Sequence, residues 1–71
     1  MREKFKMQAL QASQWARSKA ILHRTSYAVL FENFREGVDH YEVAPLGSVA
    51  DGEQRNIMAI YDRDGYRERS A

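Results

Sequence analysis

A chain of 71 residues with a net charge of +1 and no cysteine is long enough for one small domain, and it excludes disulfide bonds and thiolate metal sites. No stretch approaches the roughly 20 apolar residues that a membrane span needs, and the first residues lack the apolar core of a signal peptide. We therefore expect a single cytoplasmic domain over residues 1–71 without a cofactor. Because so small a core leaves a thin stability margin, we expect support from a partner or a second copy, with an unaided small fold as the alternative.

The charges divide the chain into a basic head and an acidic body. Glu3 is the one acidic residue of residues 1–25, and the rest of the 10 acidic residues lie in residues 26–71. The basic residues of the first segment are Arg2, Lys4, Lys6, Arg17, Lys19 and Arg24. The two parts are therefore expected to attract partners of opposite charge.

Residues 3 to about 23 are predicted to form one N-terminal helix, because Ala, Gln, Lys, Arg, Leu and Met dominate and no Gly or Pro interrupts. Its apolar positions form two opposite sets. The small set is Phe5, Ala9, Ala12, Ala16, Ala20 and His23, and the bulky set is Met7, Leu10, Trp15, Ile21 and Leu22. We expect the bulky set to face the sheet, because it removes more apolar area from water, at about 25 cal/mol per Å².

The alanine stripe then either faces solvent or approaches a helix of a partner or second copy. The opposite orientation, with the alanines inside, is the alternative. It would turn Trp15 and Leu10 into surface anchors.

Three strands are predicted at about 26–33, 38–44 and 56–62, forming an antiparallel meander under the helix, which is an α+β fold. "NFREG" connects the first two strands, and the loop that follows Pro45 contains two glycines. Asp64-Gly65 is a hairpin turn signal, so residues 66–69 form either a short fourth edge strand or a frayed tail.

The run from Tyr27 to Phe31 is apolar throughout, which is typical of a strand covered on both faces, yet one helix covers only one face. Alternation places these residues under the helix: Val29, Phe31, Tyr41 and Val43. Leu30 then lies on the outer face with apolar residues of the third strand, beside His40 and Glu42. We expect that face to be partly buried against a partner or a second copy, and an exposed face is the alternative.

Catalysis and metal binding are not expected. His40 and Glu42 share a strand face, but a general acid–base pair also needs a pocket, which so short a chain can hardly enclose. "DRDG" at residues 62–65 has the spacing of a turn, because Tyr66 stands where a calcium loop needs an oxygen ligand. The sequence also lacks a nucleophile elbow and a phosphate-binding glycine loop.

Nucleic-acid binding is the alternative function. Lys6, Arg17 and Arg24 fall near one side of the predicted helix, which could lie along phosphates. The net negative charge of the sheet residues and the absence of an aromatic–basic RNA-binding motif favour a different function.

Protein recognition is the preferred function, because aromatic residues and arginine lead interface hot spots and loops often carry function. Phe34 and Arg35 are expected at the tip of the first connection, and Phe34 alternatively folds back over the sheet edge. The predicted contact residues are Phe34, Arg35, Leu30, Tyr61, Arg63 and Tyr66.

We therefore expect a non-catalytic inhibitor or adaptor that occupies a surface of a larger protein or nucleoprotein complex. Its acidic body would block a basic, nucleic-acid-binding surface, and homodimerisation is a companion hypothesis. The size is typical of accessory proteins of compact genomes such as those of phages and other mobile elements.

Overall fold

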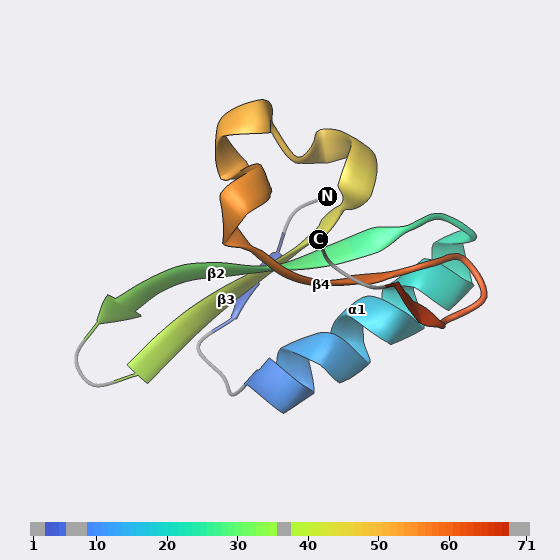
Figure 1. Cartoon of the computed structure of the whole chain (residues 1–71). Coiled ribbons are helices and arrows are strands. Elements are labelled where there is room, and N and C mark those ends of the chain that lie inside the picture. Colours follow the sequence, from blue (N-terminus) through green and yellow to red (C-terminus); the bar gives the residue numbers. More distant parts are fainter. Residues whose placement is uncertain (1–2, 6–8, 36–37, 69–71) are drawn as a thin grey trace.

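The computed structural model of the chain describes the backbone of residues 3–5, 9–35 and 38–68, and the side chains of residues 9–31 and 41–68. The elements in chain order are β1 (Glu3–Phe5), α1 (Ala9–His23), β2 (Tyr27–Arg35), β3 (Val38–Pro45), two short 3₁₀ helices, η1 (Leu46–Ser48) and η2 (Asp51–Asn56), then β4 (Ile57–Tyr61) and β5 (Arg67–Glu68). The strands form one antiparallel sheet that α1 covers on one face, so the predicted α+β fold is confirmed (Figure 1).

The strand order of the sheet is β1-β3-β2-β4-β5, with β2 at the centre. A meander would place β4 beside β3, but β4 pairs with β2 instead, so the predicted order was wrong. The chain therefore has to cross the sheet between β3 and β4. Residues 46–56, here called the crossover segment, make this crossing above the sheet, on the face opposite α1 (Figure 1).

The helix is shorter at its start than the sequence predicts. Residues Glu3–Phe5 form β1 and pair with β3, with Phe5 opposite Tyr41. Helix propensity differs by only a few tenths of a kcal/mol among ordinary residues, whereas pairing with β3 satisfies the backbone groups of an otherwise exposed strand edge. Lys6 and Met7, which were assigned to the helix, lie outside the described residues.

The end of α1 agrees with the prediction. Arg24 follows the last helical residue with a φ of 55°, and the Thr25 amide donates to the carbonyl of Ala20 at 3.2 Å. This left-handed residue and the long backbone hydrogen bond are those of a Schellman motif. The ring of His23 stacks on Tyr27 with centroids 6.0 Å apart, so the helix end is held against the start of β2.

The inner face of the sheet packs against the alanines of α1, not against its bulky side chains. Ala12, Ala16 and Ala20 are fully buried in a cluster that also contains these sheet residues: Tyr27, Val29, Tyr41, Val43 and Ala59. Our expectation that the bulky set faces the core was wrong, and the alternative orientation is confirmed. The sheet already fills the layer with large rings, so close packing leaves room only for small side chains on the helix.

The outer face of the sheet is covered by the chain itself. Ala28, Leu30 and Ala44 are buried with Val49 of the crossover segment, and Leu46, Ile57 and Ile60 pack against them. The Leu46 amide donates to the carbonyl of Ser26 at 2.9 Å, which ties the segment to the start of β2. Neither expectation for this face was right, because a segment of irregular structure covers it without a partner.

A tight turn joins β4 to β5. The Asp62 Oδ1 accepts hydrogen bonds from the amides of Asp64 at 2.9 Å and Tyr66 at 3.0 Å, and Gly65 has a φ of 86°. The predicted Asp64-Gly65 turn and the short edge strand are confirmed. The Asp62 Oδ1 therefore holds the turn by accepting hydrogen bonds from two backbone amides.

Candidate protein-binding surface

The large apolar side chains of α1 point to solvent. The exposed fraction is 67% for Leu10, 41% for Trp15, 44% for Ile21 and 71% for Leu22. This exposure follows from the burial of the alanine stripe, since the two sets lie on opposite sides of the same helix. Most of the large apolar side chains that are exposed in the described residues therefore lie on the outer face of one element, α1.

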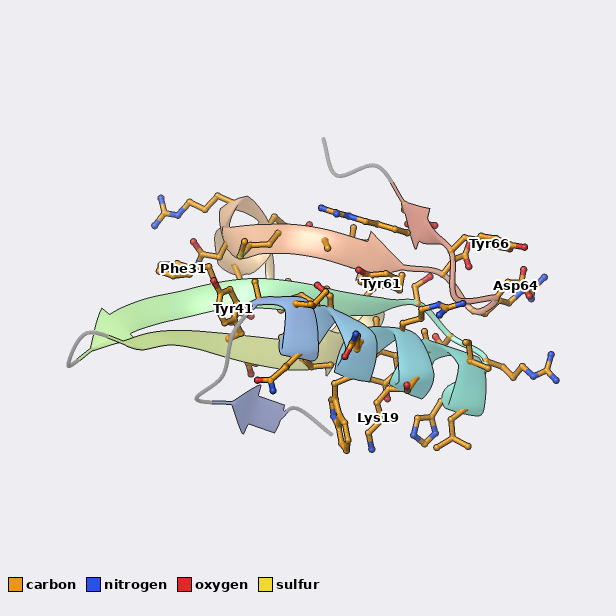
Figure 2. The ribbon with its side chains drawn as sticks, turned by 90° about the horizontal axis from the view of Figure 1, so that it is seen from below. Lys19, Phe31, Tyr41, Tyr61, Asp64 and Tyr66 are labelled. Carbon is orange, nitrogen blue, oxygen red and sulfur yellow. The ribbon has the colours of Figure 1, made fainter. Side chains whose placement is uncertain are left out.

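One flank of this outer face consists of Trp15, Lys19 and Leu22, here called the Trp15 flank. At 100° per residue, residues separated by four, three or seven positions lie on one side of a helix. The Lys19 Nζ lies 5.3 Å from the centroid of the Trp15 ring, a cation–π contact. In Figure 2, Lys19 points away from the sheet, on the side of α1 opposite the β4–β5 turn that carries Asp64 and Tyr66.

The other flank of α1 is partly used by the protein itself. The Arg17 Nε donates to the carbonyl of Gly65 at 2.9 Å, across the interval from the helix to the β4–β5 turn. A Cβ added at Gly65 would lie 2.7 Å from the Ile21 Cδ1, so Ile21 packs closely on the turn. Ile21 therefore has a structural role on this flank, whereas Trp15 and Leu22 lie on the flank that faces away from the turn.

The charged residues in and just after α1 are all basic. Residues 9–25 contain Arg17, Lys19 and Arg24 and no Asp or Glu. The described acidic side chains come from different parts of the fold. Glu42 is buried opposite Leu30 in the sheet, and Asp62 holds the β4–β5 turn.

The structure separates the residues predicted to contact a partner. Leu30 is 2% exposed and belongs to the outer core, which corrects its assignment to the surface. Tyr61 is partly buried and packs on the inner core between β4 and α1 (Figure 2). Arg63 and Tyr66 are exposed on the β4–β5 turn, with Tyr66 at 73%.

Phe34 and Arg35 are not at the tip of a connection. Both belong to β2, where Phe34 lies opposite Asp39 and Arg35 opposite Val38. A bulge between Phe31 and Asn33 shifts the register and lets the ladder continue, which satisfies more backbone groups than an early turn would. Their side chains lie outside the described set, as does the side chain of His40, which was expected on the same strand face as Glu42.

The residues of the predicted nucleic-acid site have different surroundings. Lys6 lies outside the described residues. Arg17 is tied to the β4–β5 turn through its Nε, and Arg24 is the left-handed residue after α1. Sequence reasoning missed Lys19 and Leu22 as surface residues. The signal that could have found them is the number of large rings in the strands, which predicts small residues on the helix face that covers them.

Metal and membrane chemistry find no support in the described residues. Among them, no three His, Asp, Glu or Cys side chains gather as metal ligands. No helix in the described ranges combines the length and the apolar character that crossing a bilayer demands.

No protein-family model, no curated protein and no solved structure matches this chain.

Proposed function

We propose that this chain is a non-catalytic protein-binding module that docks on a larger protein through the Trp15 flank, as an inhibitor or an adaptor. The observation that carries the proposal is the exposure of Trp15 and Leu22 on one flank of α1, in a fold whose two sheet faces are both covered. Tryptophan is enriched at the centre of binding interfaces, where its large ring is removed from water.

Leu22 is 71% exposed and Trp15 is 41% exposed, so each side chain has surface that a partner can cover. Both side chains are outside the two core clusters, and Leu22 is mostly in solvent. Single exposed apolar residues are common on protein surfaces. Here two lie two helical turns apart on the same flank, with the Lys19 ammonium over the Trp15 ring. Such a ridge combines apolar area with a charge at its edge, as interface cores with polar rims do.

The outer face of α1 supports the proposal better than the acidic body does. The described acidic side chains are distributed over β3, the crossover segment, the β4–β5 turn and β5: Glu42, Asp51, Glu53, Asp62, Asp64 and Glu68. A surface that blocks a basic partner needs these charges together.

A chain without cysteine also suits a reducing compartment, so the cytoplasm is the proposed location.

Nucleic-acid binding is the second candidate, because residues 9–25 are basic without any carboxylate. A helix of this kind would contact phosphates through Lys19 and Arg24 in a salt-sensitive, sequence-independent way. The engagement of Arg17 by Gly65 reduces what α1 offers to phosphates, and the apolar ridge has no role in such contacts.

Affinity capture with matched variants tests the proposal. The immobilised protein, Leu22→Ser and Met58→Ser are each incubated with nuclease-treated lysate, and Met58→Ser is the control because it removes an exposed apolar side chain from β4. We expect a protein that is retained by the wild type and by Met58→Ser and lost with Leu22→Ser. The retained protein is then purified and titrated into this chain while the fluorescence of Trp15, the single tryptophan of this chain, is recorded. Equal retention by all three, or retention that occurs only in a parallel lysate without nuclease treatment, would contradict the proposal.

A further inference from the structure

We infer that Asp51 is a site of spontaneous isomerisation to isoaspartate, from which the fold protects Asp64. The chain contains two Asp-Gly pairs, Asp51-Gly52 at the start of η2 and Asp64-Gly65 in the β4–β5 turn. An aspartate that precedes glycine is prone to this reaction, because glycine has no Cβ to hinder attack by its own amide nitrogen. Both pairs share this feature of sequence, so a difference between them has to come from the fold.

The reaction needs no co-reactant other than water. The Gly52 amide nitrogen attacks the Cγ of the Asp51 carboxylic acid, so that an N–Cγ bond forms and a C–O bond breaks. One carboxyl oxygen leaves as water with the amide proton and the acid proton, and a cyclic imide remains. Water then breaks the bond between that nitrogen and the main-chain carbonyl carbon of Asp51. The chain now continues through Cγ, and the former main-chain carbonyl is a carboxylate.

The Asp51-Gly52 pair is open to this attack. Both residues are exposed, and a Cβ built at Gly52 would meet nothing within 4 Å. Gly52 lies in the first turn of η2, where backbone amides have no acceptor inside the helix. No backbone carbonyl of the described residues outside η2 accepts from it either. The Gly52 nitrogen can therefore approach the Asp51 carboxyl without giving up a backbone hydrogen bond of its own.

The Asp64-Gly65 pair is held in place. The Gly65 amide donates to the carbonyl of Asp62 at 2.9 Å, and the Gly65 carbonyl accepts from the Arg17 Nε at 2.9 Å. Gly65 is also buried, and a Cβ there would lie 2.7 Å from the Ile21 Cδ1. Attack by the Gly65 nitrogen requires the β4–β5 turn to open first, so the rate falls with the small population of the open state.

Isomerisation of Asp51 acts on the outer layer of the fold. The Ala50 amide donates to the Glu53 Oε1 at 3.1 Å, and the Glu53 amide donates to the carbonyl of Ala50 at 2.9 Å, so two hydrogen bonds span the pair. Isoaspartate adds one backbone carbon between Ala50 and Glu53, which disturbs the geometry of both bonds. Val49, directly before Ala50, is buried in the outer core. The modified chain is therefore loosened at the crossover segment, while α1 keeps its contacts.

Incubation of the folded and the unfolded chain tests the inference. The purified 71-residue protein is kept for weeks in buffer and in concentrated urea and is then digested. Electron-transfer fragmentation of the peptides distinguishes isoaspartate from aspartate. In buffer we expect isoaspartate to form at Asp51 at least about fivefold faster than at Asp64, because only the second site has to open first. In urea the two rates should agree within about twofold, because the unfolded chain does not hold either turn.

Matched glycine variants identify the attacking nitrogen. Gly52→Ala should lower the rate at Asp51 by at least about fivefold, since its Cβ hinders the attack. Gly47→Ala, the same change at another open position of the crossover segment, should leave that rate unchanged. Circular dichroism of both variants verifies that they fold. In the aged wild-type protein, amide exchange should increase at Ala50 and stay unchanged in α1.

The possible results separate the role of the fold from that of the sequence. Equal rates at the two sites in buffer, or a faster rate at Asp64, would overturn the inference. A difference that persists in urea would also overturn it, because its cause would then lie in the neighbouring residues. The same holds if Asp51 forms isoaspartate only in urea, or if both glycine variants change its rate equally. Unchanged exchange at Ala50 would contradict the effect on the outer layer.

Discussion

The two faces of the sheet are covered in different ways. The inner face is covered by a regular helix that contributes small side chains to rings supplied by the sheet. The outer face is covered by the crossover segment, which contributes Leu46 of η1 and Val49 between η1 and η2. A helix that buries alanines keeps its large residues for its other side. The crossover segment, by contrast, has no large apolar side chain that is exposed. The layer with the smaller buried side chains on its helix is therefore the one that leaves large apolar side chains exposed.

The outer layer can be tested by removing its largest side chain. Leu30→Ala should lower the free energy of unfolding by about 2–4 kcal/mol, because Leu30 is almost fully buried and a cavity would remain. Urea unfolding measured by circular dichroism gives the change. Leu22→Ala on the exposed side of α1 is the control and should cost less than about 0.5 kcal/mol. Equal losses would mean that the crossover segment does not cover the sheet.

The inner layer should be sensitive to the opposite change. Ala16→Leu should lower the free energy of unfolding by about 1–3 kcal/mol, because no space remains between α1 and the strands. Gln14→Leu adds the same side chain on the exposed side and should be nearly neutral. Thermal unfolding of the pair compares them. If Ala16→Leu proves stabilising, the helix does not approach the sheet as closely as the buried alanines indicate.

The edge of the inner layer depends on Gly65. Gly65→Ala should cost about 1–2 kcal/mol, since a Cβ there would meet the Ile21 side chain and the φ of 86° disfavours an L-residue. Gly52→Ala, where a Cβ meets nothing within 4 Å, is the control and should be neutral or slightly stabilising. Urea midpoints of the two variants decide between these expectations. A neutral Gly65→Ala would show that the β4–β5 turn moves freely relative to α1.

The smallest change in the free energy of unfolding is expected at η2, in the crossover segment. The Ala50 amide donates to the Glu53 Oε1 at 3.1 Å and the Glu53 amide donates to the carbonyl of Ala50 at 2.9 Å, which closes the first turn of η2. Glu53→Ala should cost about 0.5–1 kcal/mol. Glu53→Gln, which keeps an acceptor, should restore most of it. Hydrogen exchange of the Ala50 amide checks whether the loss is local, and unchanged exchange would contradict it.

The sequence predicts the elements of this fold better than their arrangement. The helix end near His23, the strands β2, β3 and β4, and the Asp64-Gly65 turn follow from propensity and turn chemistry within a few residues, whereas β1 was predicted as helix. The pairing of β4 with β2 is a choice between distant segments. The sequence between Pro45 and Ile57 contains no signal that the chain crosses the sheet there.

The orientation of α1 shows why the candidate site was only partly predictable. Area buried by the helix alone favours Leu10 and Trp15 inside, but the layer has a fixed volume that Tyr27 and Tyr41 already fill. The alternative orientation did place Trp15 and Leu10 on the surface. The surface positions of Leu22 and Lys19 follow from the same limit on volume. Predicting them requires knowing which strand side chains share the inner face.

The position of the crossover segment has a practical consequence. Gly47 and Gly52 lie on it, opposite α1, with open space where a side chain would start and without a positive φ. Because the chain has no cysteine, Gly52→Cys would provide a single thiol for a dye or a solid support. A protein immobilised through this thiol is attached by the face opposite α1, so the outer face of the helix stays accessible to molecules in solution.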